Sequence, residues 1–397
     1  MADAPLKGVR VLEMARVLAG PWAGQLLADL GADVIKVENP DGGDETRQWG
    51  PPFLTDADGQ SLGAAYFHGA NRGKRSVTAD LRNKDDLGFV RRLAAHSDAM
   101  IENFKTGGLK KYGLDYETVR VDNPKLVYCS ITGFGQTGPY AGHAGYDFII
   151  QGMSGFMSVT GEPDGQPMKA GVAFADLFTG LYAVSAIQAA LIHVMKTGKG
   201  QHIDMALMDS QVAVLANQNM NFLATGKSPQ RLGNFHPNIS PYEVVPTCDG
   251  HLILAVGNDG QFARLCKVLG LEALPADPKF ATNRDRVANR EALHDLISAK
   301  TELFERDALL SRCEANAVPA GPINAIGEMF DDPQVRARGM RLDLEDGGGG
   351  TLPGVASPMK MSQTPPRHER PAPRLGEHND EVRAELERLE ATDNNQI

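Results

Sequence analysis

Residues 8–38 read GVRVLEMARVLAGPWAGQLLADLGADVIKVE, and this stretch decides the fold. It opens with a strand-like apolar run at residues 8–14 and turns at Gly20-Pro21. A helical pattern follows over residues 22–30, stops at a glycine, and gives way to a second strand-like run at residues 32–38. Because neighbouring strands joined through a helix run parallel, the stretch predicts one β-α-β unit of a parallel sheet.

The same alternation continues along the first third of the chain. It predicts a helix over residues 84–96, a strand over 99–104, helical turns over 109–121 and a strand over 126–132. This pattern is typical of the α/β class and predicts a large Rossmann-like domain with a helix-covered parallel sheet. Ligands of such sheets bind beyond the carboxyl ends of the strands. We therefore expect the loops after four strand ends to lie near one another, namely those after Met14, Glu38, Phe104 and Thr132.

The length of 397 residues exceeds what one hydrophobic core usually supports, so two domains are expected. After helical patterns at residues 177–195 and 208–224, a Gly/Pro/Asn-rich stretch at 226–241 indicates a boundary. A hairpin pattern around Asp249-Gly250 and two further helical patterns, 261–269 and 291–304, then predict a smaller α/β domain. The predicted division is a large domain 1–225, a small domain 226–320 and a C-terminal segment 321–397 that returns to the large domain. That segment is expected to contain a tight hairpin at 346–350 and a charged helix at 380–389.

Composition excludes several classes of function. The net charge of -10 argues against a general nucleic-acid binder, because phosphate binding depends on clustered Lys and Arg. The four scattered cysteines form no C-x-x-C pair and favour a reducing cytoplasm over a disulfide framework. The motifs of zinc proteases, EF-hands and serine hydrolases are absent from the sequence, so no metal site is expected.

The chain shows neither a signal peptide at its start nor a convincing membrane span, so a cytoplasmic location without membrane attachment is expected. Residues 170–195 are long and apolar. They nevertheless contain four polar side chains and many small residues, which favour a buried helix: Asp176, Ser185, Gln188 and His193.

Asp176 is the most informative residue, because it is a lone carboxylate in the apolar stretch GVAFADLFTG, residues 171–180. It falls where the N-cap of the following helix is expected, and from this segment alone a cap is the more common explanation. The alternative is a carboxylate nucleophile in an apolar pocket, kept ionised by the helix dipole and by an ordinary carboxyl pKa of about 3.9.

Three further motifs allow two interpretations each. The segment 133–138 matches G-x-G-x-x-G, but a loop follows it where a dinucleotide site needs a helix, so nucleotide-cofactor binding is disfavoured. The basic loop 71–75, NRGKR, and the pair Lys110-Lys111 are equally compatible with phosphate binding and with solvated surface. His143 and the pair Tyr146-Asp147 are either hydrogen-bonding groups of the core or a second acid and base.

Several blocks, in order, resemble the class III coenzyme A transferases of the formyl-CoA and carnitine CoA-transferase type. The blocks are 16–21 RVLAGP, 27–38 LADLGADVIKVE, 43–47 GDETR, 101–104 IENF, 132–139 TGFGQTGP and the segment around Asp176. The likeness spans nearly the whole chain and is closest to the branch that exchanges CoA between succinyl-CoA and dicarboxylic acids. It implies transfer of CoA to a small carboxylic acid, with acyl-CoA as substrate and no prosthetic group. It also implies a homodimer of interlocked, ring-shaped chains.

The resemblance also implies roles for individual residues. Asp176 becomes the nucleophile, which reverses the preference for a cap. The implied CoA-binding residues are Val17, Leu18, Ala19, Asn71, Arg72, Lys74, Arg75, Asn103, Phe104 and Lys111. The implied substrate contacts are Tyr146, Asp147, His236 and Asn238, with Arg47 or Arg231 as the cation for a distal carboxylate.

Two other functions stay open. The family is similar to α-methylacyl-CoA racemases, which pair the same aspartate with a histidine where this chain has Tyr146. Because proton exchange needs two opposed acid/base groups, the tyrosine favours acyl transfer, although His143 stands three residues earlier. A CoA-binding module without catalytic activity is the third possibility.

Overall fold

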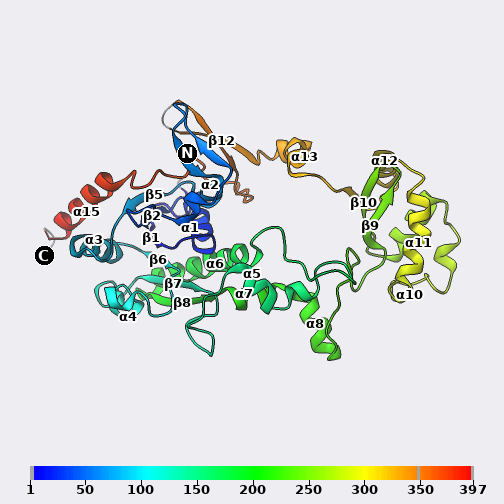
Figure 1. Cartoon of the computed structure of the whole chain (residues 1–397), viewed down its shortest axis with the longest axis horizontal. Coiled ribbons are helices and arrows are strands. Elements are labelled where there is room, and N and C mark those ends of the chain that lie inside the picture. Colours follow the sequence, from blue (N-terminus) through cyan, green and yellow to red (C-terminus); the bar gives the residue numbers. More distant parts are fainter. Residues whose placement is uncertain (1–3, 347–348, 395–397) are drawn as a thin grey trace. The chain divides into compact units, whose positions relative to one another are not determined.

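The structure is a computed structural model that describes residues 4–346 and 349–394, and the chain divides into two compact units (Figure 1). The first unit contains the residues up to Phe156, then Ala170–Leu223 and the residues from Pro333 onward. The second contains Met157–Lys169 and Ala224–Asp332. The observed second unit therefore runs further than residue 320 and takes in a short stretch, 157–169, that the sequence pattern did not separate from the large domain.

A six-stranded parallel sheet forms the centre of the first unit. Its strand order is β5-β2-β1-β6-β7-β8, and every neighbouring pair is parallel. The strands are β1 Arg10–Met14, β2 Asp33–Glu38, β5 Arg75–Thr78, β6 Ala99–Glu102, β7 Val127–Thr132 and β8 Gln201–Ala206. The predicted parallel α/β sheet is confirmed. Strand β8 was not predicted, because it is an edge strand with largely exposed, polar residues that lacks a buried apolar run.

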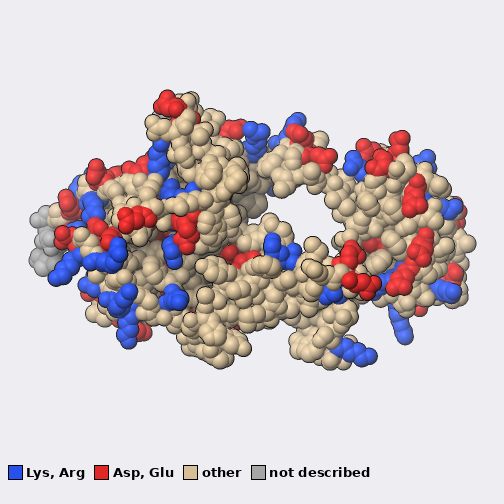
Figure 2. Space-filling model, viewed as in Figure 1, with Lys and Arg blue, Asp and Glu red and all other residues tan. Residues whose placement is uncertain are grey.

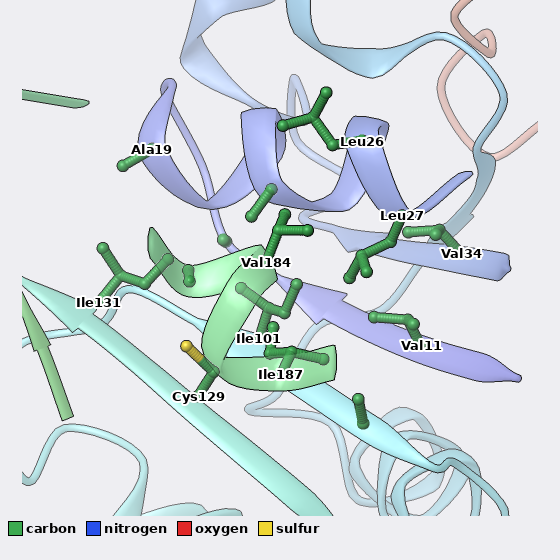
Figure 3. Packing of buried hydrophobic residues seen from close by; sticks show 14 of the residues in the cluster. Val11, Ala19, Leu26, Leu27, Val34, Ile101, Cys129, Ile131, Val184 and Ile187 are labelled. Atoms are coloured by element: carbon green, nitrogen blue, oxygen red, sulfur yellow. The ribbon is translucent and has the colours of Figure 1, made fainter. Parts of the chain in front are cut away.

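Helices cover both faces of this sheet, since successive strand residues point to opposite sides. One face packs against α1, Ala19–Asp29, and α6, Phe174–Thr197; Figure 3 shows side chains of both helices meeting those of Val11, Ile101 and Cys129. The other face packs against α3, Lys84–Ala95, α4, Tyr116–Asp122, and the C-terminal α15, Asn379–Asn394. Three shorter helices of this unit are α2, Ala65–Asn71, α5, Asp147–Met153, and α7, Leu207–Val214, which is followed by α8, Ala216–Thr225.

Helix α6 is long and apolar enough to cross a membrane, by length and composition only. One face of α6, with Ala183, Val184 and Ile187, lies in the core against the sheet. The expectation of a buried helix holds for that face only, because Leu181, Ile192 and Met195 are exposed. The helix predicted at 208–224 is broken at Ala216, which has a φ of 43°.

The C-terminal segment returns to the first unit and closes one edge of its sheet. The amide of His378 donates to the carbonyl of Ser76, and the amide of Thr78 donates to Oδ1 of Asn379 at 2.8 Å. These bonds satisfy part of the open edge of β5, which would otherwise be free to pair with another strand. Earlier in the segment, β12, Arg341–Glu345, pairs antiparallel with β13, Thr351–Val355. The predicted hairpin joins these strands, but its residues 347–348 lie outside the described residues.

The second unit is a smaller α/β structure with its own core. Its three-stranded antiparallel sheet contains β9, Tyr242–Thr247, β10, Gly250–Ala255, and β11, Ala320–Pro322. The β9–β10 hairpin confirms the prediction made from Asp249-Gly250. The helices of this unit are α9 Asp259–Leu269, α10 Asn283–Ala288, α11 Arg290–Thr301, α12 Arg306–Ala315 and α13 Ile326–Asp331.

Candidate active site

A cavity of about 230 Å³ lies beyond the carboxyl ends of the central strands of the first unit. The chain passes from β1 to β2 on one side, whereas it passes from the neighbouring β6 to β7 on the other side, so the connections after β1 and β6 leave in opposite directions. Such a switch point leaves a crevice in which open α/β sheets bind ligands. The loops after β1, β6 and β7 line the cavity, together with the start of α6. The expectation that these loops meet is confirmed.

Asp176 is the carboxylate that α6 contributes to this cavity. The helix begins at Phe174 and its N-cap residue is Ala173, so Asp176 lies within the first turn and makes no capping hydrogen bond. The explanation of Asp176 as a cap is therefore wrong. Asp147 of α5 does that work instead, because its Oδ1 accepts the hydrogen bond of the Ala175 amide at 2.8 Å. The other oxygen of Asp147 accepts from the side chain of Gln151 at 2.7 Å.

The charge state of Asp176 departs from the sequence-based expectation. Burial, together with the negative charge of Asp147, raises the pKa of Asp176 from 3.8 to about 7. The helix dipole acts in the opposite direction, but it is worth only about 0.3–1 kcal/mol at a helix start, so burial dominates. The free protein therefore holds Asp176 as a mixture of acid and carboxylate near neutral pH, rather than fully ionised.

Two glycines give the cavity its shape. A Cβ on Gly133 would lie 2.4 Å from Cα of Gly145, and a Cβ on Gly145 would lie 2.5 Å from Cα of Gly133. The two backbones touch, and both residues line the cavity beside Tyr146 and Asp147. The G-x-G motif therefore serves close backbone packing. A loop follows it up to α5, as the sequence analysis expected for a segment that does not bind a dinucleotide.

Sequence reasoning missed one residue near the site, Tyr66 at the start of α2. Burial and the negative charges of Asp176 and Asp147 raise the pKa of its phenol to about 12, which places Tyr66 within electrostatic range of both carboxylates. Its ring meets Trp49 edge to face, with centroids 5.3 Å apart. No motif marks this tyrosine, because only tertiary packing brings α2 to α6. The cations Arg16 and Lys105 also line the cavity, and the sequence analysis gave them no role in it. His143 lines the cavity as well.

A family model described as CoA-transferase family III matches residues 6–379 of the chain. The chain belongs to CoA-transferase family III. It is therefore an enzyme that transfers coenzyme A.

Named relatives and a solved structure agree with this membership. The Agrobacterium fabrum protein named succinate–glutarate CoA-transferase is 68% identical over 388 residues, which span 98% of this chain and 97% of that protein. The mouse succinyl-CoA:glutarate CoA-transferase is 42% identical over 97% of this chain and 87% of its own length. The crystal structure of a CaiB/BaiF family protein from Brucella suis is similar with a TM-score of 0.87 and 57% identity, covering 97% of this chain and 100% of that one.

In this family III transferase, the basic loop 71–75 does not present its cations to a ligand. Arg72 forms an ion pair with Asp29 at 2.5 Å, and Lys74 contacts Glu13 at 2.8 Å with its side chain fully buried. Arg75 is bound by Asp33 and by two glutamates of α15. Asn71 is buried and accepts a hydrogen bond from Lys74. Because internal partners engage all four side chains, we leave them out of the proposed CoA site.

Arg47 is likewise engaged inside the transferase. Its guanidinium donates two hydrogen bonds to Glu38, at 2.9 and 2.7 Å, and lies 3.7 Å from the ring centroid of Phe67. It is therefore unsuited to hold a distal carboxylate. Arg231 belongs to the second unit, where it donates to three backbone carbonyls. His236 and Asn238 also belong to that unit, and their roles as substrate contacts stay predictions.

A second cavity of about 260 Å³ shares Arg16 and Phe104 with the first. It is lined by residues that follow β1, β2, β5 and β6. Tyr112 lines it as well, and the exposed Lys111 places its ammonium 4.7 Å from the Tyr112 ring centroid. Among the described residues, no group of three or more His, Cys, Asp or Glu side chains is arranged to hold a metal ion.

The raised pKa of Asp176 predicts a pH-dependent effect on the stability of the transferase. Between pH 4 and about 7 the folded state keeps a proton on Asp176 that the unfolded state has lost, so this residue makes stability fall as pH rises through that window. Asp176→Asn removes the penalty, which reaches up to about 4 kcal/mol above pH 7. We expect the variant to melt several degrees higher than the wild type at pH 8.5, with a smaller difference at pH 5.5. A variant that melts lower at both pH values would contradict the assignment.

Proposed function

We propose that the protein transfers CoA from succinyl-CoA, or a similar dicarboxylyl-CoA, to a dicarboxylic acid such as glutarate, with Asp176 as the nucleophile. The observation that carries the proposal is a partly buried carboxylate in the first turn of α6, lining a cavity at the switch point of the sheet. The names of the relatives support the substrate class, since the Agrobacterium protein is 68% identical over 98% of the chain.

The proposed chemistry is a series of acyl exchanges on Asp176. An oxygen of the ionised Asp176 attacks the thioester carbonyl carbon, the C–S bond breaks, and CoA leaves as a thiolate. The thiolate then attacks the aspartyl carbonyl of the mixed anhydride, which releases succinate and leaves an aspartyl-CoA thioester. The acceptor carboxylate repeats the two steps in the opposite order and regenerates the free aspartate. No net proton or electron is exchanged.

The two cavities support an assignment of the substrate's parts. The reactive end of acyl-CoA would occupy the cavity of Asp176, and its nucleotide end the second cavity. Val17, Leu18, Ala19 and Asn103 line the first, and Phe104 lines both. Arg16 also lines both, and its ion pair with Glu45 at 3.2 Å is largely exposed, so this pair is weak enough to exchange for a substrate anion. We assign Arg16, Lys105 and Lys111 as the cations that meet the anionic groups of the substrates.

A panel of donors and acceptors tests the substrate class. Each acyl-CoA is mixed with each acid, and the formation of the new acyl-CoA is followed by chromatography. We expect the highest kcat/KM for succinyl-CoA or glutaryl-CoA paired with a four- to six-carbon dicarboxylate. Activity confined to monocarboxylates or to carnitine-like acids would overturn the proposed class.

The racemase alternative is tested by deuterium uptake. His143 shares the cavity with Asp176, and it packs against the rings of Phe134 and Tyr140. A racemase incorporates deuterium from D₂O at the α-carbon of a branched acyl-CoA without needing a free acid. We expect no such uptake, because transfer breaks no C–H bond. A CoA-binding module without activity would show neither reaction.

We also propose that the transferase is a homodimer. On the face drawn in Figure 2, charged side chains gather over α3, α4 and α15 and are sparse over α7. Large apolar side chains are exposed on α5, α6, α7 and α8, among them Phe148, Met153, Leu181, Ile192, Met195, Val212 and Met220. A second copy of the chain would cover such a surface. The interlocked, ring-shaped form of the dimer remains a prediction from the resemblance. A cytoplasmic location also remains a prediction, and the four free cysteines support it.

Charges on α6 should break this dimer. Ile192 and Met195 lie one turn apart, far along α6 from Asp176, and are 51% and 85% exposed. We expect Ile192→Asp/Met195→Asp to shift the mass measured by light scattering from twice the chain mass to 42.7 kDa. Val121→Asp on α4 is the control, because Val121 is 76% exposed but lies outside this apolar surface. A monomeric wild type, or a variant that stays dimeric, would contradict the proposal.

A further inference from the structure

Val17 has a backbone conformation that a β-branched residue rarely adopts. Its φ is 68°, in the left-handed region, and it lies between β1 and α1 in the wall of the Asp176 cavity. Valine at such an angle is strained, because its branched Cβ crowds the following carbonyl. Strain of this kind persists only where the surrounding structure holds it, and it concentrates at functional sites.

A cluster of buried charges lies directly beneath this segment. Glu13, Lys36, Lys74 and Asp44 all have fully buried side chains or nearly so. Nζ of Lys36 lies 3.0 Å from Oε1 of Glu13 and 3.0 Å from Oδ2 of Asp44. Glu13 also accepts a hydrogen bond from Lys74, so it joins the two lysines. Burial acts to lower the pKa of Lys36, but the carboxylates around it raise that pKa, so the lysine stays charged.

Each member of the cluster that reaches the backbone holds a different point of the strained segment. Nζ of Lys36 donates to the carbonyl of Ala15 at 2.7 Å. The Val17 amide donates to Oδ1 of Asp44 at 3.3 Å. Nζ of Lys74 donates to the carbonyl of Pro21 at 2.8 Å, in the first turn of α1. The bonds therefore fix the chain before, at and after Val17.

Asn103 completes the clamp from the side of β6. Its Oδ1 accepts from the Arg16 amide at 2.9 Å, and its Nδ2 donates to the Arg16 carbonyl at 2.7 Å. A side chain that bonds both backbone groups of one residue fixes the peptide planes on either side of it. The strained segment is thus held by side chains from three parts of the sheet: β2 with the loop after it, the residue before β5, and the residue after β6.

We propose that the buried pair Lys36–Asp44 is a positioning device that holds Val17 in its strained conformation and so fixes the wall of the cavity that faces the reacting acyl group. Lys36 lines neither cavity, and Asp44, which is 1% exposed, lines only the second, so neither side chain faces the reacting acyl group. The pair acts through the backbone of Ala15 and Val17. The inference rests on the proposed function of Asp176. A rigid, preorganised wall matters for catalysis because a displacement of about 1 Å can lower a rate roughly 100-fold.

The test compares charge removal with pair removal. Asp44→Asn leaves the buried Lys36 short of one carboxylate, so it should lower both the melting temperature and kcat. Lys36→Met/Asp44→Asn removes both charges and should regain stability, since replacing a buried ion pair with uncharged groups is often neutral. The double variant still loses the bond to the Ala15 carbonyl. We therefore expect its kcat to stay about 10–100-fold low while KM for acyl-CoA changes less than about threefold.

Hydrogen exchange provides a structural measure, and Asp29 a matched control. The peptide covering residues 15–19 should exchange faster in the double variant than in the wild type. Asp29→Asn disturbs another ion pair that is almost fully buried, the pair with Arg72, whose bonds do not reach Val17. It should lower stability and leave kcat within about twofold.

Val17→Gly covers the case in which the charge variants fail to fold. Glycine accepts the left-handed conformation without strain, so this variant should fold, exchange faster at residues 15–19 and show the same loss of kcat. A wild-type kcat in the double variant or in Val17→Gly would overturn the inference. The proposed function has its own test in Asp176→Asn, and it fails if that variant keeps transfer activity. If Asp176→Asn is inactive but Lys36→Met/Asp44→Asn is fully active, only the positioning role is refuted.

Discussion

Asp176→Asn is expected to lower CoA transfer by about 10⁴-fold or more, because the neutral amide cannot attack the thioester as a carboxylate does. Glu45 also lines the cavity, where it pairs with Arg16. Asp147 also lines the cavity, but both of its oxygens accept hydrogen bonds from protein donors. The exchange of label between succinyl-CoA and free succinate, followed over time, measures the loss with a single acyl pair.

Asp209→Asn is the matched control, because Asp209 is an exposed aspartate in the first turn of α7 and lies outside the residues that line the cavity. It should leave exchange unchanged. An Asp176→Asn protein that is folded, binds acyl-CoA and keeps more than about a hundredth of the wild-type rate would refute Asp176 as the nucleophile. Loss of activity together with a gain in stability at alkaline pH would be the signature of a functional residue held in an unfavourable environment.

The second large effect is a fall of kcat/KM on the acid side of neutral pH. The attacking species is the carboxylate, and the pKa of Asp176 in the free enzyme is raised to about 7. Protonation therefore removes the nucleophile as the pH falls, by about tenfold per pH unit and roughly 100-fold at pH 5. Initial rates between pH 5 and 9, at limiting acyl-CoA, measure this fall, which is the acid limb of the pH profile of kcat/KM.

Asp147→Asn separates the two causes of the raised pKa. The asparagine oxygen can still accept from the Ala175 amide, but the neighbouring negative charge is gone. The limb should move to lower pH, because one of the two causes has been removed. A profile that is flat from pH 5 to 8, or a limb that moves to higher pH in Asp147→Asn, would contradict this account of the site.

The fold was predictable where the apolar pattern was strong. The pattern of residues 8–38 predicted β1, α1 and β2, and the glycines and prolines around residue 230 predicted the boundary between the two units. Strand β8 was not predicted, because an exposed edge strand lacks the run of buried apolar residues that indicates a strand. The place of residues 157–169 in the second unit was not predicted, because it depends on tertiary contacts, which no local sequence pattern encodes.

The site was predictable only in part, and for a physical reason. Strand ends located the cavity, and an isolated carboxylate in apolar sequence located Asp176. The charge state of Asp176 did not follow from the sequence, because it depends on burial and on Asp147, which stands in another helix. The assignment of the basic loop 71–75 to CoA binding did not hold for the same reason. Its cations form ion pairs with carboxylates distant in the sequence, those of Asp29, Glu13 and Glu385.

The central claim is that Asp176 carries the transferred group in a covalent bond, and chemical trapping during turnover tests it most directly. The enzyme is mixed with succinyl-CoA and quenched with borohydride, which reduces an aspartyl thioester to the alcohol, and the digested protein is mapped by mass spectrometry. We predict homoserine at residue 176 in the wild type, only when acyl-CoA is present. Turnover that continues while Asp176 stays unmodified, with the reduced side chain found at another residue, would contradict the account.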